Sequence, residues 1–157
     1  MAAQETLCRH MVLDFALLAT AADLSGGKLS VLGGGFDTFH VSELPAQVPP
    51  FVLAARIESM DAAERKEGHV AVVKIINPDG SLSGNLELPF MFPPGSNKTK
   101  ALIVLVISTE FAREGLHKIR LLCDQNLMKE FDLHIQVIEK RRESEECNEE
   151  PDATRKP

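Results

Sequence analysis

Five histidines carry the most versatile chemistry in this chain, because imidazole is a common metal ligand and a general acid or base near neutral pH. No two of them have the close spacing, such as His-x-His on a strand, that puts two ligands on one face. A metal site would therefore need the fold to bring distant residues together. The histidines are His10, His40, His69, His117 and His134.

A convergent metal site is accordingly one hypothesis, and it requires at least three ligands from separate segments in one pocket. On this alternative the protein is a metal-dependent enzyme or a metal-stabilised domain. Scattered histidines are more often solvated strand-end or loop residues, so the sequence assigns no metal ligand set. The candidates are His40, His69, His117, His134, Asp37 and Asp132.

Three aspartates in or near expected turns offer a second type of site, because loop carboxylates at one end of a β-sandwich can bind Ca²⁺. They are Asp37, Asp79 and Asp124. Aspartate is also a preferred turn residue, because its side chain accepts hydrogen bonds from nearby backbone N–H groups. The turn interpretation is favoured for all three.

The sequence contains no recognisable catalytic or cofactor-binding motif. It has no Gly-x-Ser-x-Gly elbow. Cys123 stands in an apolar run and is expected in the core, whereas Cys147 has mostly glutamate neighbours that would not activate a thiol. The glycines of residues 33–35 precede a strand-like segment rather than a helix, which predicts a turn or bulge instead of a phosphate cradle. No catalytic residue, cofactor or cofactor ligand is predicted.

Asp14 lies inside the apolar first segment. A carboxylate there must face solvent, pair with a cation or accept backbone hydrogen bonds. We expect a structural pairing with a basic residue such as Arg120.

The elements that would position these residues are short strands. A run over 11–22 is apolar on both faces and is expected at the centre of a sheet, as is the run 101–107. Strict alternation marks 82–90, and the sequence Asn-Pro-Asp-Gly at 77–80 predicts the turn before it. The segments 116–123 and 127–137 predict a final hairpin. The segment 60–67 could form one helical turn, but its charge density favours a solvated loop.

About eight to nine such strands without a convincing helix predict an all-β fold, an antiparallel β-sandwich with Greek-key-like connections. A closed β-barrel is the alternative. The expected organisation is a flexible N-terminus at 1–9, a β-sandwich domain at 10–139 and a disordered charged tail at 140–157, since that tail has no apolar face to bury.

Charge and composition limit the classes of partner that the protein can bind. The 157-residue chain carries a net charge of −6, and its one basic run is Lys140–Arg142. Nucleic acids and anionic membranes require a cationic footprint, so neither partner is predicted. The three cysteines have no metal-type spacing, which favours a cytoplasmic protein with reduced thiols. Secretion remains an alternative that requires cleavage after about residue 21.

The run ALLATAADLSGGKLSVLGGGFDTFHV resembles the opening of a group of small, uncharacterised bacterial proteins. In that group the first strand ends in a D-x-x-x-G-K-type turn, here Asp23–Lys28, and a short strand then ends in a triple glycine and an aromatic residue. The resemblance is most specific over Ala16–Phe39 and extends loosely over 10–139. The position after the glycines is often Trp there, and here it is Phe36. The resemblance implies a β-rich single domain of unknown function and no activity.

The function predicted from sequence is therefore non-enzymatic: a binding or assembly module that takes a protein partner or associates with itself through a sheet edge. Unpaired backbone groups at an edge can accept another strand.

Overall fold

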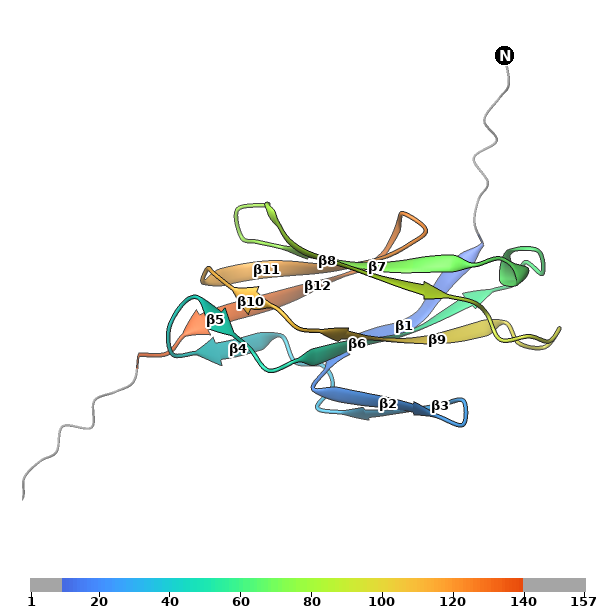
Figure 1. Cartoon of the computed structure of the whole chain (residues 1–157), viewed down its shortest axis with the longest axis horizontal. Coiled ribbons are helices and arrows are strands. Elements are labelled where there is room, and N and C mark those ends of the chain that lie inside the picture. The colour runs from blue at the N-terminus through green and yellow to red at the C-terminus, as the bar shows by residue number, and fades with distance from the viewer. Residues whose placement is uncertain (1–9, 140–157) are drawn as a thin grey trace, which may run out of the picture.

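The computed structural model describes residues 10–139, which form a two-sheet β-sandwich with a small hairpin outside it (Figure 1). Within this range, no helix has the length and apolar character needed to cross a membrane. The elements are β1 (Met11–Ala19), β2 (Ala21–Ser25), β3 (Lys28–Leu32), β4 (Thr38–Val41), β5 (Ala46–Gln47), β6 (Phe51–Ser59), the 3-10 turn η1 (Glu64–Lys66), β7 (His69–Ile76), β8 (Leu82–Phe90), β9 (Lys100–Ile107), β10 (Glu110–Phe111), β11 (Gly115–Cys123) and β12 (Asn126–Val137).

The two main sheets have the orders β1-β6-β9 and β4-β12-β11-β7-β8. The connections β6–β7, β8–β9 and β9–β11 cross from one sheet to the other, as in Greek-key sandwiches. Every pairing in these sheets is antiparallel except that of β12 with β4. The all-β prediction is confirmed, and the sheets do not close into a barrel.

The core lies between the sheets, because alternate residues of each strand point inward. Phe51 at the start of β6 is fully buried, and its ring lies 5.7 Å from that of Phe36 and 5.4 Å from that of Phe39. Cys123 is buried in the same core, as predicted. Each fully buried Leu, Ile or Phe contributes about 1.5–3 kcal/mol through removal of apolar surface from water.

The strand count is higher than the eight to nine expected, because the first run breaks and two short strands join. β1 ends at Ala19 and β2 begins at Ala21, so the predicted continuous strand over 11–22 is wrong. The backbone N–H of Thr20, between them, donates to the carbonyls of Leu32 and Gly33 instead of continuing the ladder. β5 and β10 are two-residue strands that pair with each other.

The prediction that 11–22 and 101–107 are central strands is also wrong. β1 and β9 are the edges of their sheet, and β6 lies between them. The apolar outer face of β9 has another cause: the β2–β3 hairpin lies against β6 and β9, on the side of this sheet that faces away from the core (Figure 1). β6 is consequently buried on both faces from Phe51 to Ala55.

Several local predictions are confirmed. The glycines at 33–35 form the turn that follows β3, with Gly33 and Gly35 at positive φ, and the N–H of Gly35 donates to the carbonyl of Leu18 at 2.8 Å. The sequence at 77–80 turns the chain before β8, and β11 and β12 form the final hairpin. The expectations for 1–9 and 140–157 concern residues outside the described range.

Candidate functional site

Two adjoining hollows flank the loop between β8 and β9, and we refer to them together as the β8–β9 groove. One has a volume of about 300 Å³ and lies between this loop, β9 and the tip of the β2–β3 hairpin. The other, of about 420 Å³, lies between the loop and η1. Met91 and Pro93 line both. The cations of the groove are Arg56, Arg65, Lys66, Lys98 and Lys100, and its principal apolar residues are Leu24, Met91, Pro93 and Leu102.

The loop is fixed at its base by aromatic packing. Phe92 is buried, and its ring lies 5.9 Å from that of Phe90 and 5.7 Å from that of His69 in an edge-on arrangement. Pro93 and Pro94 follow and restrict the backbone, because proline fixes φ and lacks an N–H. Met91, which precedes Phe92, is 63% exposed. The buried ring of Phe92 thus anchors the loop, and the Met91 side chain beside it is exposed to solvent.

The far side of the loop is held by Arg65. Its Nη1 donates to the carbonyl oxygens of Ser96 at 3.2 Å and Lys98 at 3.3 Å. Because a guanidinium can donate to two acceptors at once, one side chain ties η1 to the loop. The N–H of Lys98 also donates to the carbonyl of Gly95, which closes a tight turn.

Most of 60–67 is exposed, as predicted, but Glu64–Lys66 form the turn η1, which is anchored to the core. Glu64 is 8% exposed, and its Oε2 accepts a hydrogen bond from Ser59 Oγ at 2.6 Å. Asp61 Oδ1 accepts from the N–H of Ala63, just before η1, at 2.8 Å. His69 Nε2 lies 2.7 Å from the Glu64 carbonyl oxygen. This wall of the groove therefore has little freedom to move.

Two groove cations share one carboxylate. Asp14 Oδ2 pairs with the Arg56 guanidinium and lies 3.4 Å from Lys100 Nζ. The hydrogen bond from Arg56, helped by the charge of Lys100, lowers the pKa of Asp14 below its usual value. The expectation that Asp14 pairs with a basic residue is correct, but its partner is not Arg120, whose Nε donates to Glu130 Oε2 at 2.6 Å.

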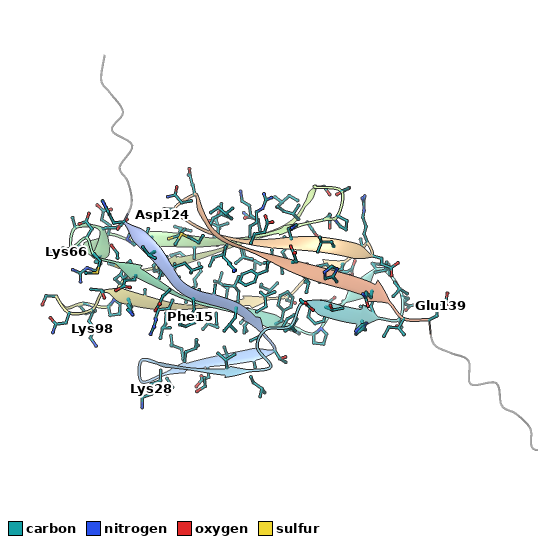
Figure 2. The ribbon with its side chains drawn as sticks, turned by 180° about the vertical axis from the view of Figure 1, so that it is seen from behind. Phe15, Lys28, Lys66, Lys98, Asp124 and Glu139 are labelled. Atoms are coloured by element: carbon teal, nitrogen blue, oxygen red, sulfur yellow. The ribbon has the colours of Figure 1, made fainter. Side chains whose placement is uncertain are left out.

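The remaining exposed cations of the groove have no such partner. Lys66 and Lys98 are exposed and make no ion pair with any residue of the described range. Lys28, at the tip of the β2–β3 hairpin, lies at the same end of the molecule (Figure 2). No carboxylate is among the residues that line either hollow. The groove is thus a concentration of positive charge on a protein of net charge −6.

The six residues proposed as convergent metal ligands do not gather. His40, Asp37 and His134 are exposed, and the backbone N–H of His134 donates to the backbone carbonyl of Asp37. Asp132 pairs with Lys118 at 2.7 Å, and this pairing lowers its pKa. Across residues 10–139, no group of three His, Cys, Asp or Glu side chains could hold a metal ion.

The two buried histidines have separate surroundings. His69 Nδ1 lies 2.6 Å from Asp124 Oδ2 in the turn between β11 and β12. His117 packs edge-on against Phe111 at 4.9 Å, its Nδ1 lies 3.2 Å from the carbonyl of Gly115, and burial lowers its pKa. Nε2 of His117 has no hydrogen-bond partner in the described part of the chain. These arrangements support structural roles.

The three loop aspartates accept hydrogen bonds from different residues, and in the described range no group of three carboxylates could hold a metal ion. Asp79 accepts from the N–H of Ser81 at 2.9 Å, and Asp124 accepts from that of Val70 at 3.0 Å. Asp37 accepts from the hydroxyl of the adjacent Thr38. The bond of Asp79 lies within its own turn, as the turn interpretation predicts, whereas the bond of Asp124 reaches β7.

Sequence reasoning missed the groove because its cations are spread over 56–100 and form no basic run. The fold brings them together from β6, η1, the β8–β9 loop and β9. A weak signal was present: the loops AERKEG and PPGSNKTK each combine lysine with turn residues. Their proximity could not be read from the sequence.

Residues 14–136 match the model of a family of unknown function, DUF6941, and the chain belongs to that family. The match agrees with the resemblance to a domain of unknown function. No curated protein matches the chain.

Three solved structures are similar to the chain at low identity. The Pseudomonas fluorescens alkylpurine DNA glycosylase AlkC, bound to DNA with an abasic site analog, is 10% identical with a TM-score of 0.48 over 82% of this chain and 31% of its own. An immunoglobulin-like protein from Pseudomonas aeruginosa is 9% identical with a TM-score of 0.38, over 80% and 96% of the two chains. A Listeria innocua β-glucosidase in complex with isofagomine is 8% identical with a TM-score of 0.41, over 79% and 17%. This chain thus spans about a third of the glycosylase.

Proposed function

We propose that the protein is a non-enzymatic binding module whose β8–β9 groove receives an acidic protein segment with apolar side chains. The observation that carries the proposal is the lining of the groove. It combines five cations with exposed Met91 and Leu24, and no lining residue bears a carboxylate. Electrostatic complementarity of this kind steers encounters and selects partners.

The apolar residues favour a peptide over a free inorganic anion. Methionine is flexible and polarizable, so it adapts to varied apolar side chains at binding surfaces. Met91 and Leu24 are 63% and 46% exposed beside the cations. A ligand that offers carboxylates and a few aliphatic side chains uses both features.

Nucleic acid fits the groove less well. Single strands bind by stacking bases on aromatic side chains along a basic channel. The chain has no Trp or Tyr, and Phe92, the aromatic residue of the groove, is buried. The earlier prediction against nucleic acid is therefore retained in the proposal. Association through a sheet edge, also predicted, stays a prediction.

The rigid walls favour binding without large rearrangement. Arg65 holds the loop, and the hydrogen bonds of Glu64 and His69 hold η1. A preformed site loses less side-chain and loop entropy on binding than a mobile one.

The test is fluorescence anisotropy with a labelled probe peptide of about ten residues that contains six glutamates and two leucines, compared with a glutamine version of the same peptide. The Lys66→Glu/Lys98→Glu double variant should raise the Kd for the acidic probe at least about tenfold. Lys74→Glu, on β7 of the other sheet, is a single-site control away from the groove and should leave the Kd unchanged.

The salt dependence of the Kd provides a second test. Binding should weaken between about 50 and about 300 mM NaCl, because exposed charges are screened over shorter distances at higher ionic strength. Equal affinity for the glutamate and glutamine peptides, or an unchanged Kd in the double variant, would overturn the proposal. Tighter binding of a single-stranded oligonucleotide than of the acidic peptide would overturn it in favour of nucleic acid.

A further inference from the structure

The C-terminal sequence contains a segment with the negative charge that the groove favours. Residues 143–152 read ESEECNEEPD, with six carboxylates and no basic residue. Cys147 and Pro151 supply its apolar character. This segment lies outside the described residues, so its chemistry here comes from the sequence alone.

The described chain ends far from the groove. Figure 2 shows Glu139 at the opposite end of the molecule from Lys66, Lys98 and Lys28. β12, which leads to that end, has 12 residues and spans about 40 Å at about 3.3 Å per residue. The groove and Glu139 thus lie at opposite ends of the described chain.

Chain length argues against occupation of the groove by the same molecule. From Glu139 to Glu146 there are seven residues, which reach at most about 25 Å when fully extended. The first three carboxylates of the segment therefore fall short of their own groove. The acidic segment of a second copy is not limited by this length, because the end of that copy can approach the groove directly.

On these grounds we infer that the occupant of the β8–β9 groove is the acidic segment 143–152 of a second copy of this chain. The inference rests on the proposed function and names its partner. Each copy then offers one groove at one end and one acidic segment at the other. Such head-to-tail contacts are heterologous, and they extend into open chains unless the geometry closes a ring.

Two complementary variants test this arrangement. One is the groove variant Lys66→Glu/Lys98→Glu, which keeps the acidic segment. The other is a tail variant in which the five glutamates of 143–152 become glutamine and Asp152 becomes asparagine, which keeps the groove. Both are measured by sedimentation velocity as full chains, with a reductant present so that Cys147 forms no disulfide.

The wild type should form dimers and larger species that increase with concentration and dissociate as NaCl rises from about 50 to about 300 mM. Each variant alone should be monomeric. Their equimolar mixture should give a one-to-one dimer that grows no further, because only one intact groove and one intact segment remain per pair. Lys74→Glu should behave as wild type.

A monomeric wild type, a tail variant that associates like wild type, or a mixture that does not pair would overturn the inference. The acidic probe peptide separates this failure from that of the proposed function. If the probe binds wild type but the tail does not drive association, the groove takes an acidic segment from another protein. If the probe also fails to bind, both proposals fail. A monomeric wild type, together with a tail variant that binds the probe more tightly than wild type, would indicate that the segment occupies the groove of its own molecule. This result would also overturn the inference.

Discussion

The guanidinium of Arg65 lies 3.3 Å from the carbonyl oxygen of Lys98 and bridges the 3-10 turn to a loop 33 residues further along the chain. The same nitrogen donates to the carbonyl of Ser96. These bonds use main-chain acceptors, so they position the backbone of the groove and leave the Lys98 side chain free to meet a ligand.

Arg65→Gln should loosen this wall. The variant cannot reproduce both hydrogen bonds, and we expect a loss of about 0.5–1.5 kcal/mol in the free energy of unfolding. Amide hydrogen exchange should accelerate in residues 95–98, and the Kd for the acidic probe should rise about three- to tenfold. Urea titration, exchange with mass spectrometry and anisotropy measure the three effects.

The control for this variant is Arg113→Gln. Arg113 is an exposed arginine that pairs with Asp79, away from the groove. It should alter neither exchange in 95–98 nor probe binding. Unchanged exchange in Arg65→Gln would show that the aromatic base alone fixes the loop.

The His69 ring is held on both sides, and this leads to a stability prediction. Its Nε2 lies 2.7 Å from the Glu64 carbonyl oxygen and its Nδ1 lies 2.6 Å from the Asp124 carboxylate, so contacts on both sides fix the position of the ring. Asp124→Asn removes the charged acceptor from a nearly buried ring. We expect a loss of about 1–3 kcal/mol in urea unfolding.

Asp79→Asn is the matched control, because Asp79 is also a turn aspartate that accepts from a backbone N–H. Its exposed bonds can be replaced by water, so its loss should be smaller. An Asp124→Asn variant as stable as Asp79→Asn would show that the pairing with His69 adds nothing beyond the turn.

His117 gives a prediction about pH. Burial lowers its pKa in the folded chain, so the unfolded chain takes up the proton first as the pH falls. The free energy of unfolding should therefore decrease as pH drops below about 6.5. His117→Leu lacks this proton and should gain stability relative to wild type as the pH falls from 7.5 to 5.5.

Urea unfolding of both proteins at several pH values provides the measurement. The other histidines are common to both chains, so their contribution cancels in the difference. At pH 7.5 the two should agree within about 1 kcal/mol, since the bond of His117 to Gly115 is a single hydrogen bond. Parallel curves at all pH values would contradict the role assigned to burial.

The sequence predicted correctly those strands and turns that depend on residues close together in the chain. Alternation over 82–90, the turn at 77–80 and the final hairpin each depend on local side-chain chemistry, and each is observed. The glycine turn at 33–35 belongs to the same class.

The features it missed depend on distant segments. The apolar outer face of β9 suggested a central strand, but a hairpin from residues 21–32 covers that side of the sheet. Asp14 and Arg56 are 42 residues apart, and His69 and Asp124 are 55 apart. The groove likewise collects charges that no local pattern joins, so its existence required the fold.

Asp14 provides the most specific prediction about the groove, because its carboxylate competes with an anionic ligand for Arg56 and Lys100. Asp14→Asn removes the competitor, so the acidic probe should bind about two- to fivefold more tightly at low salt. Asp132→Asn changes the net charge equally but lies on β12, paired with Lys118. It should leave binding unchanged, which separates a local effect from a general one.

The same variant should melt at a lower temperature than wild type near pH 7. Because the pKa of Asp14 is lowered in the folded chain, its ionised form stabilises the fold above the unfolded value of about 3.9 and this contribution is lost as the pH falls through the folded value. The difference in melting temperature should therefore disappear in strong acid. Tighter probe binding with an unchanged melting temperature would mean that Asp14 acts only as a competitor for the groove cations. A lower melting temperature with unchanged binding would mean that the ion pair is structural and that Arg56 and Lys100 do not contact the ligand.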